Sequence, residues 1–332
     1  MYFEASLKER VLKFLRLVSR RYASLPRDIT IEVSTRCPQQ CAMCFRSPLA
    51  LAGKTMDFGL FTRIVERIGS GFAGKPPGYL NFVGLGEPFC NEALAEMLGF
   101  AKKTLPETGM NVSTSLAAFD RAAFAGWAEG GIINRLSISI DGVDETGPFH
   151  PFTPEIADNF RFIQELRTRR SDFRIRVQTL MISQKQVREV VELARSMGAD
   201  ELQLMRIDLH AFSGKPPVTR PPLEEERAIV RLASRLAADC GIRCLNNNSH
   251  DLFMDIASRY GRTCLITDDH IFIDVDGEVR PCFCLRATSF GNLGRKSLAE
   301  VVRNKRASGF YRTQRSLCSG CDIYRKDQRP RP

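Results

Sequence analysis

The sequence lacks any long hydrophobic stretch. No run among its 332 residues approaches the roughly 18 consecutive apolar residues that a transmembrane helix needs. The opening segment, MYFEASLKERVLKFLRLVSRR, carries too many charges for a signal-peptide core and has no small-residue cleavage site. We therefore expect a cytoplasmic protein with no transmembrane segment.

Nucleic-acid-binding motifs are also missing. The formal net charge is +10, from 48 Lys and Arg against 38 Asp and Glu. Much of this charge lies near the two ends, and no aromatic residues are interleaved with it as in a nucleic-acid-binding stripe. We interpret it as a solvated basic surface and expect no specific nucleic acid. With 43% apolar and 26% charged residues, the chain has the composition of an ordinary globular protein.

Cysteine is the informative residue, because there are 11 of them and no sign of export. An odd number in such a chain favours metal ligands or reactive thiols over a disulfide framework. Cys37, Cys41 and Cys44 follow residues 29–35, which we predict to form a buried strand. Three thiolates can hold an iron–sulfur cube and leave its fourth iron open. Zinc is the alternative, but it would need a fourth protein ligand.

This C-x3-C-x2-C spacing after a first strand, followed by the aromatic Phe45, resembles the radical S-adenosylmethionine (SAM) enzymes. The resemblance implies a [4Fe–4S] cluster whose open iron is chelated by SAM. It also implies a reductant such as flavodoxin or ferredoxin, whose electron cleaves SAM to a 5′-deoxyadenosyl radical. That radical removes hydrogen from a substrate C–H bond.

Strand and helix patterns alternate after residue 28, as in βα units around a parallel sheet. The predicted strands are 29–35, 79–84, 109–115, 134–141, 173–182 and 200–207. We expect an α/β fold, a partial (β/α)6 TIM-like barrel like that of the family. We divide the chain into a basic amphipathic helix over 1–28, the barrel over 29–245, and a C-terminal domain over 246–332.

Candidate SAM-binding residues lie where these strands end. The segment Gly84-Leu-Gly86-Glu87-Pro88 resembles the family's GGEP motif, although Leu85 stands where that motif has a glycine. A plain strand-to-helix turn is the alternative. By the resemblance, further cofactor-binding candidates are Phe45, Ser113, Ser115, Ser139, Asp141 and Gln178. Arg206 is a weaker candidate for the cavity wall. Structural polar residues inside the barrel are the alternative for Ser139 and Asp141.

The last 70 residues predict a hairpin with an Asp276-Gly277 turn, a helix over 298–305, and a C-x2-C pair. This order resembles the twitch or SPASM extension of radical SAM enzymes. No cysteine follows Cys321, which favours the twitch form. We expect one auxiliary [4Fe–4S] cluster held by Cys264, Cys282, Cys318 and Cys321. A four-cysteine zinc ribbon is the alternative, and Cys284 is either a further ligand or a free thiol.

The expected function is oxidation or epimerisation of a small polar substrate such as a sugar or aminocyclitol. We prefer that substrate class because no leader-binding domain precedes the barrel. Cys90 and Cys284 are the candidate hydrogen-donating thiols, with inert buried cysteines as the alternative. A peptide-modifying maturase with the same clusters is the second hypothesis. A non-catalytic zinc or iron–sulfur binding module is the third.

Overall fold

The computed structural model describes residues 28–72, 76–143, 149–169, 172–212, 216–246 and 270–321, with Val11, Leu15, Cys264 and Thr267 besides. The predicted N-terminal helix over 1–28 lies outside the described residues, apart from Val11 and Leu15, which are both helical, and Asp28, which begins the first strand instead. No helix in the described part is long and apolar enough to cross a membrane.

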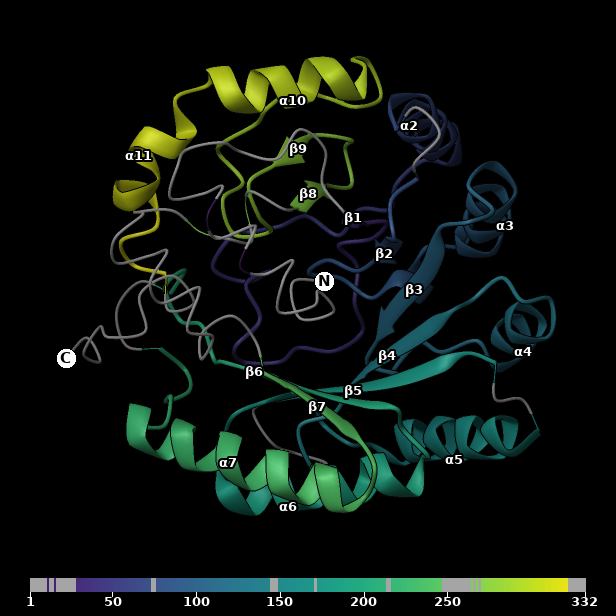
Figure 1. Cartoon of the computed structure of the whole chain (residues 1–332), viewed down its shortest axis with the longest axis vertical. Helices are drawn as coiled ribbons and strands as arrows, with labels where there is room; N and C mark the ends of the chain where they lie inside the picture. Colours follow the sequence, from purple (N-terminus) through teal and green to yellow (C-terminus); the bar gives the residue numbers. More distant parts are fainter. Residues whose placement is uncertain are drawn as a thin grey trace.

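A curved sheet forms the centre of the molecule, and helices cover its outer side (Figure 1). Its strands run in the order β7-β6-β5-β4-β3-β2-β1-β8-β9. The parallel strands of the barrel are β1 (Asp28–Ile31), β2 (Tyr79–Phe82), β3 (Gly109–Thr114), β4 (Arg135–Ser139), β5 (Arg174–Leu180), β6 (Glu201–Met205) and β7 (Arg243–Asn246). The predicted α/β partial barrel is confirmed.

Helices connect these strands in the alternating order that parallel pairing requires. They are α2 (Phe58–Gly71), α3 (Leu94–Thr104), α4 (Arg121–Glu129), α5 (Pro154–Arg169), α6 (Gln184–Ser196) and α7 (Leu223–Asp239). Helix α6 shows why they form: the side chain of Ser183 accepts a hydrogen bond from Gln186 N at its start, and Val187, Val190 and Val191 recur on one buried face.

The concave face of the sheet is polar. Arg135 on β4 donates through Nε to Asn111 Oδ1 at 3.1 Å and reaches Asn81 Oδ1 on β2 at 3.4 Å, across the intervening strand. Arg176 on β5 donates to Glu201 Oε2 at 2.8 Å. Because these residues lie early in their strands, the amino-terminal half of the barrel is filled by a hydrogen-bonded polar layer.

The C-terminal hairpin continues the barrel's sheet. Strand β8 (His270–Ile273) pairs in parallel with β1, and β9 (Val279–Arg280) pairs antiparallel with β8. The turn between them has Gly277 at φ +83°, a conformation that glycine adopts without strain. Helices α10 (Leu298–Ala307) and α11 (Phe310–Leu317) follow. The boundary between the barrel and the C-terminal domain at residue 246 stays a prediction.

Candidate functional site

Three cysteines lie together in a loop after β1, which we call the first cysteine loop (residues 37–46). Arg46 donates to Cys37 O at 3.3 Å and also to Gln39 O, and Cys44 N donates to Cys41 O at 3.0 Å. Burial raises the pKa of Cys37 to about 11. Burial and the neighbouring thiols raise the pKa of Cys41 to about 12. A bound metal would hold these sulfurs as thiolates, because thiol ligands bind metals in their deprotonated form.

The glycine turn (residues 84–88) lies directly against this loop. A Cβ atom on Gly86 would lie 2.3 Å from Ser34 O and 2.6 Å from Thr35 Cα. Glu87 N donates to Arg36 O at 2.7 Å, one residue before Cys37. The backbones approach so closely that only glycine fits at position 86 without a shift.

Glu87 is buried at the end of the glycine turn, with 3% of its surface exposed. Its Oε2 atom accepts hydrogen bonds from Ser115 N and Ser115 Oγ, both at 2.9 Å. Burial raises the pKa of Glu87, and the hydrogen bonds from Ser115 partly oppose that rise. Glu87 and Ser115, both predicted from the sequence, therefore form one unit beside the first cysteine loop. Pro88 begins the short 3-10 helix η2 (Pro88–Cys90) that follows.

Buried polar atoms without partners test whether this region fits a bound group. Within the described residues, Gln39 Nε2, Arg46 Nε and Glu87 Oε1 are buried and have no hydrogen-bond partner. Such atoms are rare in native proteins, and each calls for an explanation such as a bound ion, a water molecule or a catalytic role. The three belong to the first cysteine loop and the glycine turn. Together with three unpaired thiols, they fit an iron–sulfur cluster that carries a polar ligand.

Three further SAM-binding candidates lie on the concave face of the sheet. Ser113 Oγ on β3 donates to Gln178 Oε1 on β5 at 3.0 Å, and Gln178 Nε2 donates to Gln203 Oε1 on β6 at 3.0 Å. Ser139 is half-buried at the end of β4 and lies opposite Gln178 in the register. The structure thus places Ser113, Ser139 and Gln178 on one interior surface.

Asp141 follows β4 and pairs with His150, a residue that the sequence analysis missed. Its Oδ1 atom accepts from Leu180 N at 2.7 Å and from Thr179 Oγ1 at 3.2 Å, while Oδ2 contacts the His150 ring. Burial alone would raise the pKa of Asp141, but His150 outweighs it and the pKa is lowered. Burial works against protonated His150, yet Asp141 raises its pKa. Asp141 therefore positions His150 as well as being a candidate ligand itself.

The C-terminal cysteines gather around the end of α11. Gln314 on this helix accepts from Cys264 N at 3.2 Å and donates to Thr267 Oγ1 at 2.9 Å. Cys318 caps the helix, and Cys321 N donates to Cys318 O at 3.1 Å. The pKa of Cys318 is raised first by burial and then by its neighbours Cys264 and Cys282. Residues more than 50 positions apart are thus brought to one place, as the auxiliary-cluster prediction requires.

Cys284 belongs to the same group. It lies with Cys282 in the second cysteine loop (residues 282–286), where its hydrogen bond lowers the pKa of Cys282 to about 7. Its own pKa is raised well above the usual range, first by burial. A ligand atom of Cys284 also lies within 4.8 Å of ligand atoms of Asp208 and His210, and Asp208 Oδ2 is 3.8 Å from Cys321 Sγ. Cys284 therefore has the position of a further ligand or a neighbouring thiol.

Phe45 joins these parts of the site. Its ring centroid lies 5.3 Å from that of His210, 5.9 Å from that of Phe212 and 6.3 Å from that of Phe283. The first cysteine loop, the segment after β6 and the second cysteine loop therefore meet at one ring. Sequence reasoning missed Asp208 and His210; their only signal was their position just after a strand of the parallel sheet.

The remaining candidates lie less centrally. Cys90 is half-buried in η2, where burial and then Glu87 raise its pKa, and it lies close enough to Cys37 to affect that thiol. Cys244 is 3.7 Å from Ser234 Oγ and packs against the core, which fits a structural role. Arg206 forms a buried ion pair with Glu226 at 2.9 Å instead of presenting its charge to the cavity.

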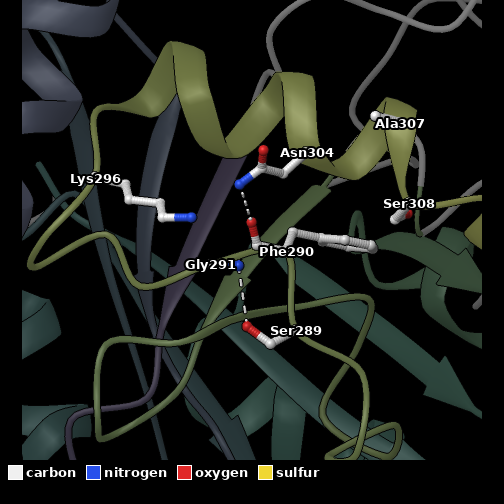
Figure 2. Close-up of a pocket in the computed structure, with 7 residues that line it drawn as sticks. All are labelled: Ser289, Phe290, Gly291, Lys296, Asn304, Ala307 and Ser308. Carbon is white, nitrogen blue, oxygen red and sulfur yellow. Dashed lines mark hydrogen bonds between the residues drawn. The ribbon is translucent and has the colours of Figure 1, made fainter.

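A surface pocket of about 470 Å³ lies away from all of these residues (Figure 2). It lies between α10 and the segment from Ser289 to Lys296. Asn304 Nδ2 donates to Phe290 O, and Gly291 N donates to Ser289 Oγ, both at 3.0 Å. Its size alone does not mark it as functional, because those polar groups already have partners.

Comparisons with known proteins agree with this geometry. Residues 264–322 match the SPASM family, described as an iron–sulfur cluster-binding domain. The PqqA peptide cyclase of Rhodopseudomonas palustris is 25% identical over 324 residues, which is 90% of this chain and 79% of the cyclase. Streptococcus suis SuiB bound to S-adenosylmethionine superposes with a TM-score of 0.71 and 16% identity, over 96% of this chain and 75% of SuiB. Native anSMEcpe with bound AdoMet superposes with a TM-score of 0.63 and 15% identity, over 91% of each chain.

The first cysteine motif, the barrel fold and the similarity to the PqqA peptide cyclase together support the recognition of a radical SAM enzyme. The match at residues 264–322 identifies the C-terminal part of the chain as a SPASM domain. The iron–sulfur description of the SPASM match and the relatives solved with bound AdoMet support a SAM-bound [4Fe–4S] cluster and an auxiliary cluster as its cofactors. The radical SAM resemblance recognised from the sequence is confirmed, and the C-terminal extension matches the SPASM domain.

Proposed function

We propose that this enzyme modifies a peptide, removing hydrogen from a C–H bond of an amino-acid residue and oxidising it to form a new bond. The observation that carries the proposal is the 25% identity, across 90% of the chain, to a protein named a peptide cyclase. SuiB, which shares the fold, has been solved bound to the precursor peptide SuiA. These findings favour the peptide hypothesis over the sugar or aminocyclitol that we first expected.

Exposed apolar side chains beside the auxiliary site support a peptide substrate. Phe283 lies between Cys282 and Cys284 and is 43% exposed, and Leu317 precedes Cys318 and is 45% exposed. Exposed large apolar groups at a site favour ligands with apolar surface. These two residues suit the apolar side chains of a peptide.

The cofactor roles follow from the residues present. Cys37, Cys41 and Cys44 would hold the first cluster, and Glu87 Oε1 would accept a hydrogen bond from the ammonium group of SAM. When bound, this group supplies the 5′-deoxyadenosyl radical that removes hydrogen. Gly86 allows the glycine turn to lie against the cysteine loop.

The auxiliary site has its own proposed ligands and role. Cys264, Cys282, Cys318 and Cys321 would hold the auxiliary cluster, which would accept the electron released by oxidation. Flavodoxin or ferredoxin is the proposed reductant. Hydrogen donation by Cys90 or Cys284 would apply only if the product were an epimer.

The test uses anaerobically reconstituted protein with SAM and dithionite. The first probe is a library of short synthetic peptides, and the second is an aminocyclitol. We expect peptide-dependent formation of 5′-deoxyadenosine and a peptide product that has lost two hydrogens by mass spectrometry. Cys37→Ala is the control without SAM cleavage. Stimulation by the aminocyclitol alone would refute the peptide proposal, and absence of 5′-deoxyadenosine in the wild type would refute an active enzyme.

A further inference from the structure

One buried ion pair connects the two cofactor sites. Glu32 follows β1 and is fully buried, with 0% of its surface exposed. Arg286, at the end of the second cysteine loop, donates through Nη1 to Glu32 Oε2 at 2.7 Å and through Nη2 to Glu32 Oε1 at 2.8 Å. This two-bond arrangement fixes both the distance and the plane of the two groups.

The same carboxylate also holds the glycine turn. Glu32 Oε1 accepts a hydrogen bond from Leu85 N at 2.9 Å. A Cβ atom on Gly84 would lie 2.3 Å from Glu32 Cγ, so the side chain lies directly against the backbone of the turn. Glu32 Oε1 is thus shared between the turn beside the first cysteine loop and the guanidinium of Arg286.

Arg286 in turn holds the second cysteine loop. Its Nε atom donates to Phe283 O at 2.7 Å, between the two cysteines of that loop. Its own carbonyl accepts from Arg280, whose Nε donates to Asp274 Oδ2 at 2.7 Å. The guanidinium also lies 5.1 Å from the ring centroid of Phe272. Its side chain is only 16% exposed, so water does not readily replace these contacts.

We infer that the Glu32–Arg286 pair is a positioning device that couples SAM binding to the state of the auxiliary cluster. A movement of the second cysteine loop changes the position of Arg286. Because the Glu32 carboxylate is buried, it must follow its only described charged partner or remain as an uncompensated charge. Any movement of Glu32 is passed to Leu85 N and Gly84. By thermodynamic reciprocity, SAM binding must affect the auxiliary site equally.

Alternative variants separate this coupling from general stability. Arg286→Met removes both hydrogen bonds to Glu32, Arg286→Lys keeps the charge without the paired geometry, and Glu32→Gln removes the negative charge while an amide oxygen can still accept from Leu85 N. Arg167 provides a matched control. It binds Asp200 through two contacts of 2.9 and 3.0 Å and is also 16% exposed. This pair lies at the opposite ends of the strands, because Arg167 is near the end of α5 and Asp200 directly precedes β6.

The experiment measures SAM binding by equilibrium dialysis in the fully reconstituted protein. We expect Arg286→Met to weaken SAM binding at least about fivefold, the lower end of typical coupling between sites. Arg286→Lys should give an intermediate loss, and Arg167→Met should leave the dissociation constant unchanged. Iron content and thermal unfolding verify that each variant is folded. If Arg286→Met does not fold, the SAM dissociation constants of Arg286→Lys and Glu32→Gln are compared with that of Arg167→Met instead.

A second readout follows the auxiliary cluster by electron paramagnetic resonance during redox titration. Saturating SAM should shift its midpoint potential in the wild type and in Arg167→Met, but not in Arg286→Met. A variant in which the midpoint potential of the auxiliary cluster changes while SAM affinity stays within twofold of wild type would overturn the inference. A SAM-induced shift that persists without Arg286 would also overturn it. No substrate takes part in either measurement, so both results are independent of whether a peptide is the substrate.

Discussion

Replacing Gly86 with alanine tests the packing of the glycine turn against the first cysteine loop. The added Cβ atom would lie 2.3 Å from Ser34 O, 2.6 Å from Thr35 Cα and 2.7 Å from Arg36 O. All three are backbone atoms, so no side chain can rotate away. Either the turn or the segment before Cys37 must move.

The cost can be estimated from the kind of strain involved. Overpacking a close-packed site destabilises a protein by about 1–3 kcal/mol. For domains of about 150–250 residues, each kcal/mol lowers the Tm by about 2–4 °C. The displacement also changes the position of Glu87, the residue after Gly86. We therefore expect Gly86→Ala to lower the Tm by several degrees and to weaken SAM binding.

Gly99→Ala is the matched control for this substitution. Gly99 lies within α3, and a Cβ atom there would meet nothing within 4 Å. Gly99 is half-buried, and alanine within a helix stabilises a protein by about 0.5–1 kcal/mol relative to glycine. Thermal unfolding and SAM binding are measured for both variants. Wild-type SAM affinity and Tm in Gly86→Ala would refute the close approach of the turn to the loop.

Three other predictions concern the auxiliary cluster, the Glu87 carboxylate and the Asp141–His150 pair. Cys318→Ala should lower the iron content from about eight to about four atoms per chain, whereas Cys244→Ala should leave it unchanged. Ser115→Ala removes the hydrogen bond from Ser115 Oγ to the Glu87 carboxylate, which is worth about 1.5–3 kcal/mol. Because this bond favours the charged carboxylate, its loss raises the pKa of Glu87, which burial already raises. SAM affinity should therefore begin to fall at a higher pH than in the wild type, as measured by dialysis across the acidic range. His150, whose pKa is raised by its carboxylate partner against the effect of burial, stabilises the fold at pH values below its ordinary pKa of about 6.5. The Tm difference between wild type and His150→Gln should shrink as the pH rises through the raised pKa, and a constant difference would contradict this.

Much of the barrel could be predicted from local sequence patterns. The segment Leu136-Ser-Ile-Ser alternates apolar and polar side chains and lies in β4, within the predicted range 134–141. Strand β7 was missed because Arg243-Cys-Leu-Asn is short and has polar residues at both ends. Pairing of β8 with β1 could not be predicted, because it joins residues more than 200 positions apart and local patterns contain no information on such contacts.

The residues of the site also fall into two groups: those that local motifs predict and those that only the fold brings together. Cys37, Cys41, Cys44 and Glu87 belong to motifs with a fixed spacing, so they could be recognised one after another. Glu32 and Arg286 belong to no motif; each is an ordinary charged residue until the fold brings their side chains to 2.7 Å. The preference for a sugar substrate is less well supported than the peptide alternative for a related reason. It rested on an expected absence, and no positive feature of the sequence supported it.

The polar interior supports placing the proposed chemistry at one end of the barrel. TIM-like barrels usually fill their interior with apolar layers, yet here Arg135 and Arg176 lie inside the amino-terminal half. Each has polar partners, and the Arg135 guanidinium also lies 4.1 Å from the ring centroid of Tyr79. At the carboxyl ends of the strands, by contrast, the buried Glu87 Oε1 has no partner among the described residues. A buried carboxylate oxygen is costly unless something binds it. The interior therefore favours a cationic ligand at the carboxyl end, where the three cysteines of the first loop also lie.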